Sequence, residues 1–248
     1  ERKIPPHERG NTSCSYSINT MVTPPLTARP KVVDIFKNLG SIPKKIHVSW
    51  VSKTFIDDEN TKNLNIVKHG IGALKKLNPN YKFEISDNDD VEDYIKQHIP
   101  IEDYDLIKCK KIVEKVDLWR LLKMYNEGGV YMDIDRLCNI PLDNLLSLEL
   151  VCILPMHYDI DFAQDIMISS PKNIIHKTAI ELNLQRRREG WTDILSLGPV
   201  TYFHAVTICL LGKQLERYPD KTNLSKLREI INNSPYLHTY RENPPYDT

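Results

Sequence analysis

The hydrophobic residues of this 248-residue chain change their spacing repeatedly from residue 42 onward. Residues 45–51, KIHVSWV, form a short apolar run typical of a buried β-strand, and the apolar residues between 64 and 74 then recur at helical spacing. Asn78-Pro79-Asn80 should end that helix, because proline disfavours helical geometry at the residue before it. The pattern therefore predicts a strand and then a helix at the start of a folded domain.

The same alternation continues toward the C-terminal end. Strands are predicted at 81–85, 130–133, 151–155, 165–169 and 236–240, and helices at 91–97, 112–127, 174–188 and after Gly198-Pro199. Gly128 stands where a left-handed cap would end the clearest helix. Strands alternating with helices predict an α/β fold with a largely parallel, doubly wound sheet. We assign this single domain to residues 41–248, and residues 1–40, rich in Pro, Ser, Thr and Asn, to an irregular arm.

Charge argues against a nucleic-acid partner. The chain has 33 Lys plus Arg and 33 Asp plus Glu, whereas a nucleic-acid binder usually carries a basic excess or a basic face. The run Arg186-Arg187-Arg188 is the one local exception, and we interpret it as a solvated helix end, where basic residues are favoured.

Cysteine usage and hydropathy bear on the compartment. The five cysteines are scattered without a CxxC pair, which argues against a disulfide framework and a structural zinc site and favours a reducing, cytoplasmic location. No apolar run approaches the ~20 residues of a membrane helix, so no span is expected in this chain. The chain begins at Glu1, so a lost signal or anchor stays open.

Two aspartates carry the main chemical signal. Residues two apart in an extended segment face the same side, so Tyr131, Asp133 and Asp135 should project together from the end of a strand. Ligands bind beyond the carboxyl ends of strands in open α/β sheets, and two carboxylates there can hold Mg²⁺ or Mn²⁺. A bare D-x-D triplet, however, is more often a solvated turn.

The residues before the triplet strengthen the metal interpretation. Asp117 and Arg120 lie three apart on the predicted helix and share a face. They form either a local helical ion pair of little energetic weight or a hydroxyl-binding carboxylate beside a cation. Gly128-Gly129 should give a tight reversal that brings this helix beside the strand. We expect the Asp117–Arg120 pair and the pair of aspartates to meet at one cleft.

Five ordered blocks of the sequence carry a family resemblance: IPKKIHVSW at 42–50, N-P-x-Y at 78–81 with Asp87, D-x-x-R at 117–120, G-G-x-Y-x-D-x-D at 128–135 and P-L-D at 141–143. They resemble the DXD-containing glycosyltransferases of family 32, which include the yeast initiating α-1,6-mannosyltransferase and bacterial capsular sugar transferases. Their spacing is also similar to the glucosyltransferase domain of large clostridial toxins. The resemblance is thin from 151 to 198 and does not cover residues 1–40.

The resemblance implies a GT-A fold and a retaining transferase that takes a sugar from a UDP- or GDP-sugar to a glycan or other hydroxyl acceptor, with Mn²⁺ or Mg²⁺. It implies the following roles: Asp135 as principal metal ligand, Asp133 as donor and metal ligand, Asp117 and Arg120 on sugar hydroxyls, Tyr131 lining the donor site, Val48, Trp50 and Asp87 near the nucleobase, Asp165 near the donor or acceptor sugar, and His238 as a third metal ligand. Trp50 is equally explained as a core aromatic, Asp165 as a turn residue and His238 as a structural histidine.

Two other functions stay open. A haloacid-dehalogenase-type phosphatase also uses D-x-D at a strand end, but that family requires a small hydroxyl residue where this chain has Leu137. A binding module with the same fold and no turnover would keep every motif above.

Overall fold

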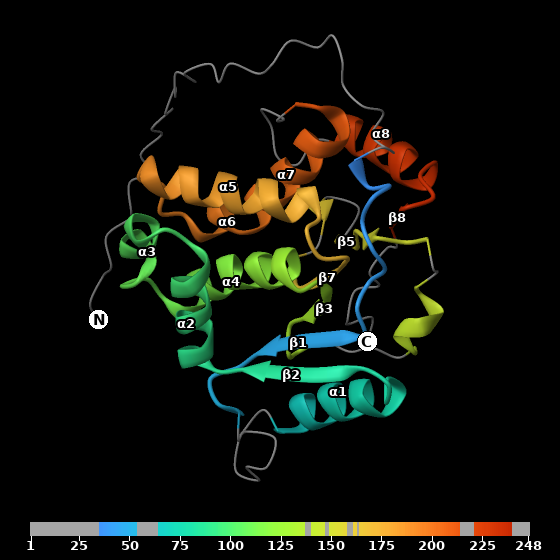
Figure 1. Ribbon diagram of the computed structural model, residues 1–248, viewed down its shortest axis with the longest axis horizontal. Helices are drawn as coiled ribbons and strands as arrows, with labels where there is room; N and C mark the ends of the chain where they lie inside the picture. Colours follow the sequence, from blue (N-terminus) through green and yellow to red (C-terminus); the bar gives the residue numbers. More distant parts are fainter. Residues whose placement is uncertain are drawn as a thin grey trace, which may run out of the picture.

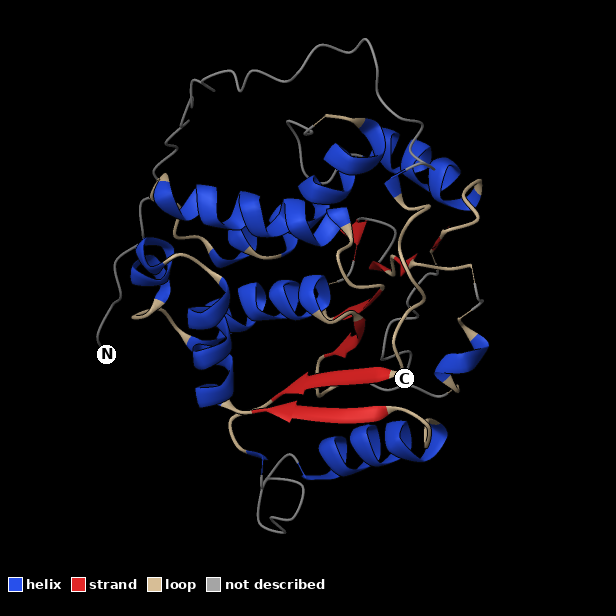
Figure 2. Cartoon of the chain, in the orientation of Figure 1, coloured by secondary structure: helices blue, strands red, loops and turns tan. Residues whose placement is uncertain are grey.

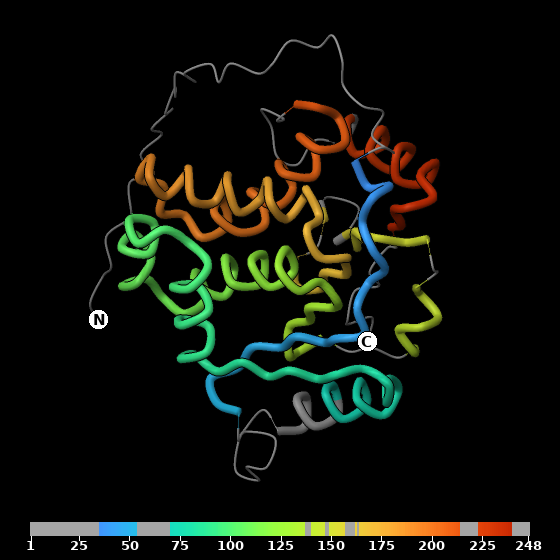
Figure 3. Tube along the Cα trace, in the orientation of Figure 1, coloured from blue at the N-terminus to red at the C-terminus, as the bar shows by residue number. Residues whose placement is uncertain are grey.

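The computed structural model describes residues 35–53, 64–136, 140–146, 149–157, 161–162, 164–213 and 221–239. Most of the predicted arm, residues 1–34, lies outside this set, as do Cys14 and Cys138. The side chain of Phe36 is fully buried against the helical core, together with residues of the last helix, so packing begins before residue 41. Figure 3 lets the reader follow this blue segment from beside the last helix down to the first strand.

A six-stranded sheet, with strand order β2-β1-β3-β7-β4-β8, forms the centre of the described chain. Its strands are β1 (Lys45–Ser49), β2 (Lys82–Ser86), β3 (Gly129–Met132), β4 (Cys152–Ile153), β7 (Ile166–Ser169) and β8 (Leu237–His238). The pairs β1–β2, β1–β3 and β4–β8 are parallel, whereas β7 runs antiparallel to both neighbours. The predicted mostly parallel α/β sheet is confirmed, with one inserted antiparallel strand.

Helices cover both faces of this sheet, as Figure 2 shows. They are α1 (Leu64–Leu77), α2 (Asn88–His98), α3 (Ile101–Ile107), α4 (Ile112–Asn126), α5 (Ile174–Arg188), α6 (Ile194–Leu197), α7 (Pro199–Leu211) and α8 (Lys221–Asn232). A 3₁₀ turn, η4 (Leu142–Asn144), and a two-stranded ribbon, β5 (Met156–His157) with β6 (Asp161–Phe162), complete the described elements. The sequence pattern did not predict α3, α6, α8, the 3₁₀ turn or the ribbon.

The pleat of β3 divides the core in two. Val130 and Met132 pack on the face covered by α1, whereas Tyr131 between them packs on the face covered by α4. Both faces are buried, so the strand reads as an unbroken apolar run rather than an alternating one. This register places the hydroxyl-bearing ring of Tyr131 on the same side of the sheet as α4.

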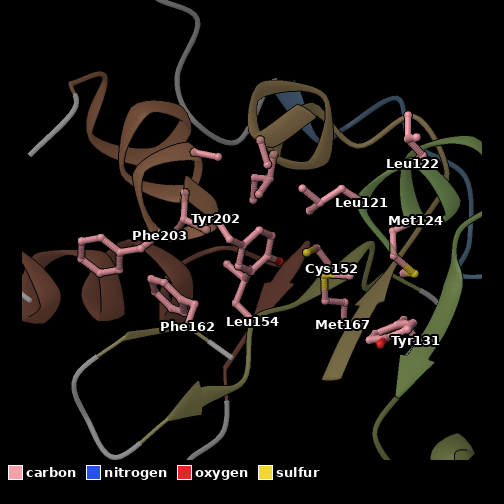
Figure 4. Close-up of a cluster of buried hydrophobic side chains, with 14 of the residues drawn as sticks. Leu121, Leu122, Met124, Tyr131, Cys152, Leu154, Phe162, Met167, Tyr202 and Phe203 are labelled. Atoms are coloured by element: carbon pink, nitrogen blue, oxygen red, sulfur yellow. The ribbon is translucent and has the colours of Figure 1, made fainter. Parts of the chain in front are cut away.

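The larger core lies on the α4 side (Figure 4). Tyr131, Met167 and Cys152 point from the sheet toward α4 and α7, and Tyr202 and Phe203 of α7 close the layer. These five side chains are at most 1% exposed, and each large one contributes ~1.5–3 kcal/mol by its burial. The sheet is thereby fixed against α4 and α7, the helices whose ends meet the site.

The α4–β3 connection depends on two glycines. Gly128 and Gly129 have φ of 65° and 100°, in the left-handed region. A Cβ at Gly128 would lie 2.6 Å from the Pro171 nitrogen, and one at Gly129 would lie 2.7 Å from the Lys45 oxygen. The predicted tight reversal is confirmed, and close backbone approach is a second reason for glycine here.

The stretch Ile194–Leu211 is long and apolar enough to cross a membrane by length and composition, contrary to the expectation above. In the structure 56% of it is buried inside the protein, and Gly198 divides it into α6 and α7. Helix α7 packs along α5 and carries fully buried Phe203 and Val206. The stretch thus serves as a core helix of the described fold, and the compartment of the protein stays a prediction.

The predicted solvated helix end is wrong for two of the three arginines that end α5, whereas Arg188 is exposed. Arg186 and Arg187 are 4% and 5% exposed. Arg186 donates to the Ser196 oxygen at 2.7 Å and to the Thr201 hydroxyl at 2.6 Å. Arg187 donates to Glu114 at the start of α4, at 3.5 Å from its carboxylate. Tertiary partners, not solvent, satisfy these cations.

Candidate active site

One edge of the sheet gathers the segments that carry the predicted site. Strands β1, β2 and β3 are parallel and so end at the same edge, where Trp50, Asp87 and Asp133 follow them. Strand β7 is antiparallel and begins there, and the Asp133 backbone N–H donates to the Asp165 oxygen at 2.7 Å. Four chain segments that are distant in sequence therefore meet beyond β3.

Helix α4 adds a buried ion pair to this edge. The Arg120 guanidinium donates to Asp117 Oδ1 at 2.6 Å, and the two residues are 7% and 6% exposed. Arg120 also donates to the Gln164 oxygen at 2.9 Å and lies 3.6 Å from Asp133 Oδ1. An exposed helical pair of this kind would contribute little, but a buried one is costly to break, by ~3–5 kcal/mol.

Tyr131 links the helix to the D-x-D triplet. Its hydroxyl donates to Asp133 Oδ1, and the Arg120 guanidinium stacks 5.0 Å above its ring. Asp117, Arg120, Tyr131 and Asp133 therefore form one connected group.

The charges of this group are unevenly shielded from water. Burial raises the pKa of Asp117, and the adjacent Arg120 offsets only part of that rise. Burial likewise raises the pKa of the Tyr131 phenol well above its usual value, so Tyr131 acts as a hydrogen-bond donor. A polyhydroxyl ligand could accept from Arg120 and donate to Asp117 in such a setting.

Asp135 is placed differently from the prediction. Strand β3 ends at Met132, and Ile134 and Asp135 form a turn in which the Arg136 N–H donates to the Asp133 oxygen at 3.0 Å. The two-residue alternation of an extended strand therefore does not reach Asp135. Asp135 is exposed and Asp133 is partly exposed, so both carboxylates are open to a cation from solution.

The nucleobase candidates divide by exposure. Val48 is 1% exposed and packs in the α1-side core, so only its backbone could line a ligand. Trp50 is partly buried against the same core. The Asp87 side chain accepts from the Asp90 N–H at 3.0 Å as the N-cap of α2 and lies 3.5 Å from the Lys53 ammonium. Asp87 thus has a structural role at the start of α2.

Two further candidates lie on the β7 side of β3, at different distances from it. Asp165 is partly buried and forms an ion pair with Arg136. His238 pairs in register with Ile153 of β4, three strand intervals from β3, which is about 14 Å across the sheet. Metal–ligand bonds are about 2.0–2.6 Å long, so this geometry lends no support to His238 sharing an ion with Asp133.

Part of the chain matches a known protein family. Residues 65–151 match the family described as glycosyltransferase sugar-binding region containing DXD motif. This segment of the chain, about a third of its length, is thus similar to the DXD glycosyltransferases. Asp87, Asp117, Arg120, Tyr131 and both D-x-D aspartates lie inside the matched segment, whereas Trp50, Asp165 and His238 lie outside it.

Two curated relatives come from Schizosaccharomyces pombe. Inositol phosphoceramide mannosyltransferase 3 is 29% identical over 119 residues, covering 46% of this chain and 30% of the relative. Inositol phosphoceramide mannosyltransferase 1 is 36% identical over 93 residues, covering 36% of this chain and 28% of the relative. The match spans less than a third of either relative's length.

A solved structure shows the same fold. PaToxG glycosyltransferase superimposes with a TM-score of 0.53, covering 80% of this chain and 81% of its own, at 18% identity. The predicted GT-A type of α/β fold is confirmed.

The structure also brings residues to the site that the sequence analysis did not name as candidates. Gln164 is 5% exposed, and neither polar atom of its side-chain amide has a hydrogen-bond partner among the described residues. Gln164 lies beside the Arg120 guanidinium, because Arg120 donates a hydrogen bond to the Gln164 backbone oxygen. A buried amide without a partner is costly, which makes Gln164 a candidate ligand group. In the sequence, a single glutamine before Asp165 does not indicate that its side chain is buried.

Gly198 is the second missed residue. A Cβ on Gly198 would lie 2.7 Å from Asp117 Oδ2, closer than real Cβ contacts allow. The start of α7 is therefore pressed against the carboxylate of the buried pair. The sequence marked Gly198-Pro199 only as a helix start, because nothing local reveals what faces it.

A second group of possible metal ligands lies on β1, β2 and the end of α4. One possible ligand atom from each of His47, Glu84 and Glu127 lies within 4.8 Å of the other two. Three lysines form ion pairs with the two carboxylates. Lys123 donates to Glu127 at 2.6 Å, Lys45 donates to Glu127 at 3.2 Å, and Lys82 lies 2.6 Å from Glu84. Burial alone would raise the pKa of Glu127, but Lys123 and Lys45 outweigh it and hold the pKa at about 2. We interpret this group as an ion network that ties β1 and β2 to α4.

Proposed function

We propose that this chain is a metal-dependent, retaining hexosyltransferase that moves a sugar from a UDP- or GDP-sugar to a hydroxyl acceptor. The observation that carries the proposal is the connected group of Asp117, Arg120, Tyr131 and Asp133 at the carboxyl edge of a GT-A sheet. The family assignment supports transfer of a sugar as the general reaction class.

In this proposal the D-x-D aspartates hold Mn²⁺ or Mg²⁺. Asp133 keeps one carboxylate oxygen outside its contact with Tyr131, and Asp135 is exposed, so the donor set suits a hard cation that takes its remaining ligands from phosphate and water. When bound, the ion would neutralise charge on the departing diphosphate. Arg120 would add positive charge from the opposite side, fixed in place before the ligand arrives.

The sugar would be held by the buried pair and its neighbours. The carboxylate of Asp117 would accept from sugar hydroxyls, and Gln164 would use its free amide on the same ring or on the acceptor, next to Asp165. Trp50 and the backbone near Val48 and Asp87 would border the nucleobase. His238 is not part of the proposed metal site.

The relatives suggest which sugar and acceptor to try first. Both are named as mannosyltransferases of inositol phosphoceramide. We therefore place a mannosyl donor and a phosphoinositol-bearing lipid at the head of the candidates, ahead of a soluble glycan.

A nucleotide-sugar screen tests the proposal. Hydrolysis and transfer are measured for UDP- and GDP-sugars with Mn²⁺, with Mg²⁺ and with EDTA, and the anomer of the product is read by NMR. We expect activity that needs metal, a retained anomer and loss of activity in Asp135→Ala. Asp93→Ala, an exposed carboxylate on α2, is the matched control and should keep full activity. Full activity in EDTA would overturn the metal requirement, and an inverted product would overturn retention.

The two alternatives have their own outcomes in the same screen. A phosphoenzyme on Asp133 would favour a phosphatase, a reading that the family match does not support. Donor binding without hydrolysis or transfer would favour a binding module.

A further inference from the structure

Exposed apolar side chains gather at one end of the described molecule. Six of its eight exposed large hydrophobic residues belong to α3, the start of α4 and the α5–α6 segment: Ile101, Leu106, Ile112, Val113, Trp191 and Leu195. Leu195 is 65% exposed, Ile101 57%, Val113 45% and Trp191 43%. Scattered exposed apolar residues are ordinary, whereas a gathering of them marks an interaction surface.

Contacts between these elements keep the residues together. Arg188 at the end of α5 donates to Asp103 of α3 at 2.7 Å, and Arg187 donates to Glu114 at the start of α4. Helix α6, which carries Leu195, contacts α4. Figure 1 shows α3, the beginning of α4 and the end of α5 side by side at the left of the molecule. We call the six apolar residues and the intervening loop 108–111 the α3–α4 surface.

The loop gives this surface a positive charge. Lys108, Lys110 and Lys111 are all exposed within four positions, directly before Ile112 and Val113. Lys108 pairs with Asp105 at 2.7 Å, while no described carboxylate lies within ion-pair distance of Lys110 or Lys111. Among the residues that the structure describes, these two cations thus have no carboxylate partner and lie beside an apolar pair.

Exposed carboxylates also occur at this end, but they lie outside the lysine loop. Asp193 accepts from the Ser196 N–H as the cap of α6, and Glu189 accepts from Gln185 at 2.8 Å. Glu102 lies in the first turn of α3, where the helix dipole favours a negative charge. Lysines next to Ile and Val, with an exposed tryptophan nearby, match the chemistry of an anionic lipid surface: the lysines meet headgroups and the apolar side chains enter the interface.

We propose that the α3–α4 surface binds the face of an anionic lipid bilayer. The surface also adjoins the site, since Val113 stands one helical turn before Asp117 on the same side of α4. Bound in this way, the chain would hold the Asp117 region close to lipid headgroups. Presentation of a lipid acceptor in this manner rests on the proposed function, but bilayer binding itself requires no sugar transfer.

Vesicle flotation of the full chain tests this directly. Phosphatidylcholine vesicles with and without phosphatidylserine are the probes, and no nucleotide sugar is present. We expect binding to the anionic vesicles and weak binding to the neutral ones. Lys110→Ala/Lys111→Ala removes two surface charges and should weaken anionic binding about thirty-fold, since each lysine near such a surface is worth about one kcal/mol.

Matched variants separate the surface from general charge. Lys75→Ala/Lys76→Ala removes two exposed lysines of α1, at the opposite sheet edge, and should bind like the unchanged chain. Ile112→Ser/Val113→Ser should weaken binding by tenfold or more through lost apolar contact. The emission of Trp191 should shift to the blue on vesicles, a change absent in Trp191→Phe.

Several results would overturn the proposal: no binding to anionic vesicles, equal loss in the α1 control, or self-association through this surface in sedimentation with vesicles left unbound. Hydrolysis of nucleotide sugars in solution is measured in parallel. Its survival in the Lys110→Ala/Lys111→Ala chain would show that a failure at the membrane is separate from a failure of the proposed transferase.

Discussion

His176 of α5 makes the stability of this fold sensitive to mild acid. Its side chain is fully buried, stacks 5.9 Å from the Tyr202 ring, and has no hydrogen-bond partner for either nitrogen among the described residues. Burial lowers the pKa of His176 to about 3. In the unfolded chain the same group has its ordinary pKa of about 6.5.

The sign and size of the effect follow from these two values. Between them the unfolded chain binds a proton that the folded chain does not, so stability falls as pH falls below about 6.5. From pH 7.5 to pH 5.0 the loss attributable to His176 is about 2 kcal/mol. His204, whose pKa is lowered by burial and by Arg186 to about 4, adds a loss of similar size. The raised pKa of Asp117 acts in the opposite direction, so the His176 share has to be measured apart from the total.

Replacement of His176 by Leu isolates the contribution of His176 to the pH dependence, because it removes the titrating group and fills the buried position with an apolar side chain. Urea unfolding is followed by the fluorescence of buried Trp119 at both pH values, in the original chain and in His176→Leu. The free energy of unfolding of the variant should fall by about 2 kcal/mol less between pH 7.5 and 5.0. An identical pH dependence in both chains would refute the reasoning, since it would mean that His176 is charged or hydrated in the fold.

Three other substitutions probe the site and its support. Gly198→Ala should lower the transfer rate by about tenfold or more while the protein stays folded, because its Cβ displaces Asp117; steady-state kinetics checks this, and an unchanged rate contradicts it. Gly129→Ala meets the Lys45 backbone oxygen at φ 100° and should cost about 3 kcal/mol or more of unfolding free energy in urea titration, so native-like stability would contradict the close approach. Asp87→Ala should cost about 1 kcal/mol, recovered in Asp87→Ser, which can still cap α2; a rise in donor KM in both variants would show a separate role in binding.

Much of the fold could be predicted because its signals are local. The helix 174–188 has the predicted bounds, and α4 ends within a residue of the prediction, at the glycine pair whose positive φ the sequence implied. The position of Asp117 and Arg120 on one face follows from helical spacing alone. Helix α3 was missed because its seven residues alternate acidic and apolar letters without a strong period.

What could not be predicted depends on contacts between distant segments. The sequence around Arg187 is typical of a solvated helix end. Its burial depends on Glu114, 73 positions earlier, which the fold brings beside it. The antiparallel direction of β7 is invisible in its apolar pattern, yet it decides that Gln164 lies beside Arg120. Asp135 leaves the strand alternation because a turn begins one residue earlier than the period suggests.

The most direct test of the central claim is calorimetric titration of UDP and GDP into the full chain with Mn²⁺ and with EDTA. The account predicts binding of at least one nucleotide that requires Mn²⁺, is lost in Asp135→Asn and is kept in Asp93→Ala. Equal binding in EDTA, or full binding by Asp135→Asn, would contradict the assignment of a metal-held donor to the D-x-D edge of this sheet.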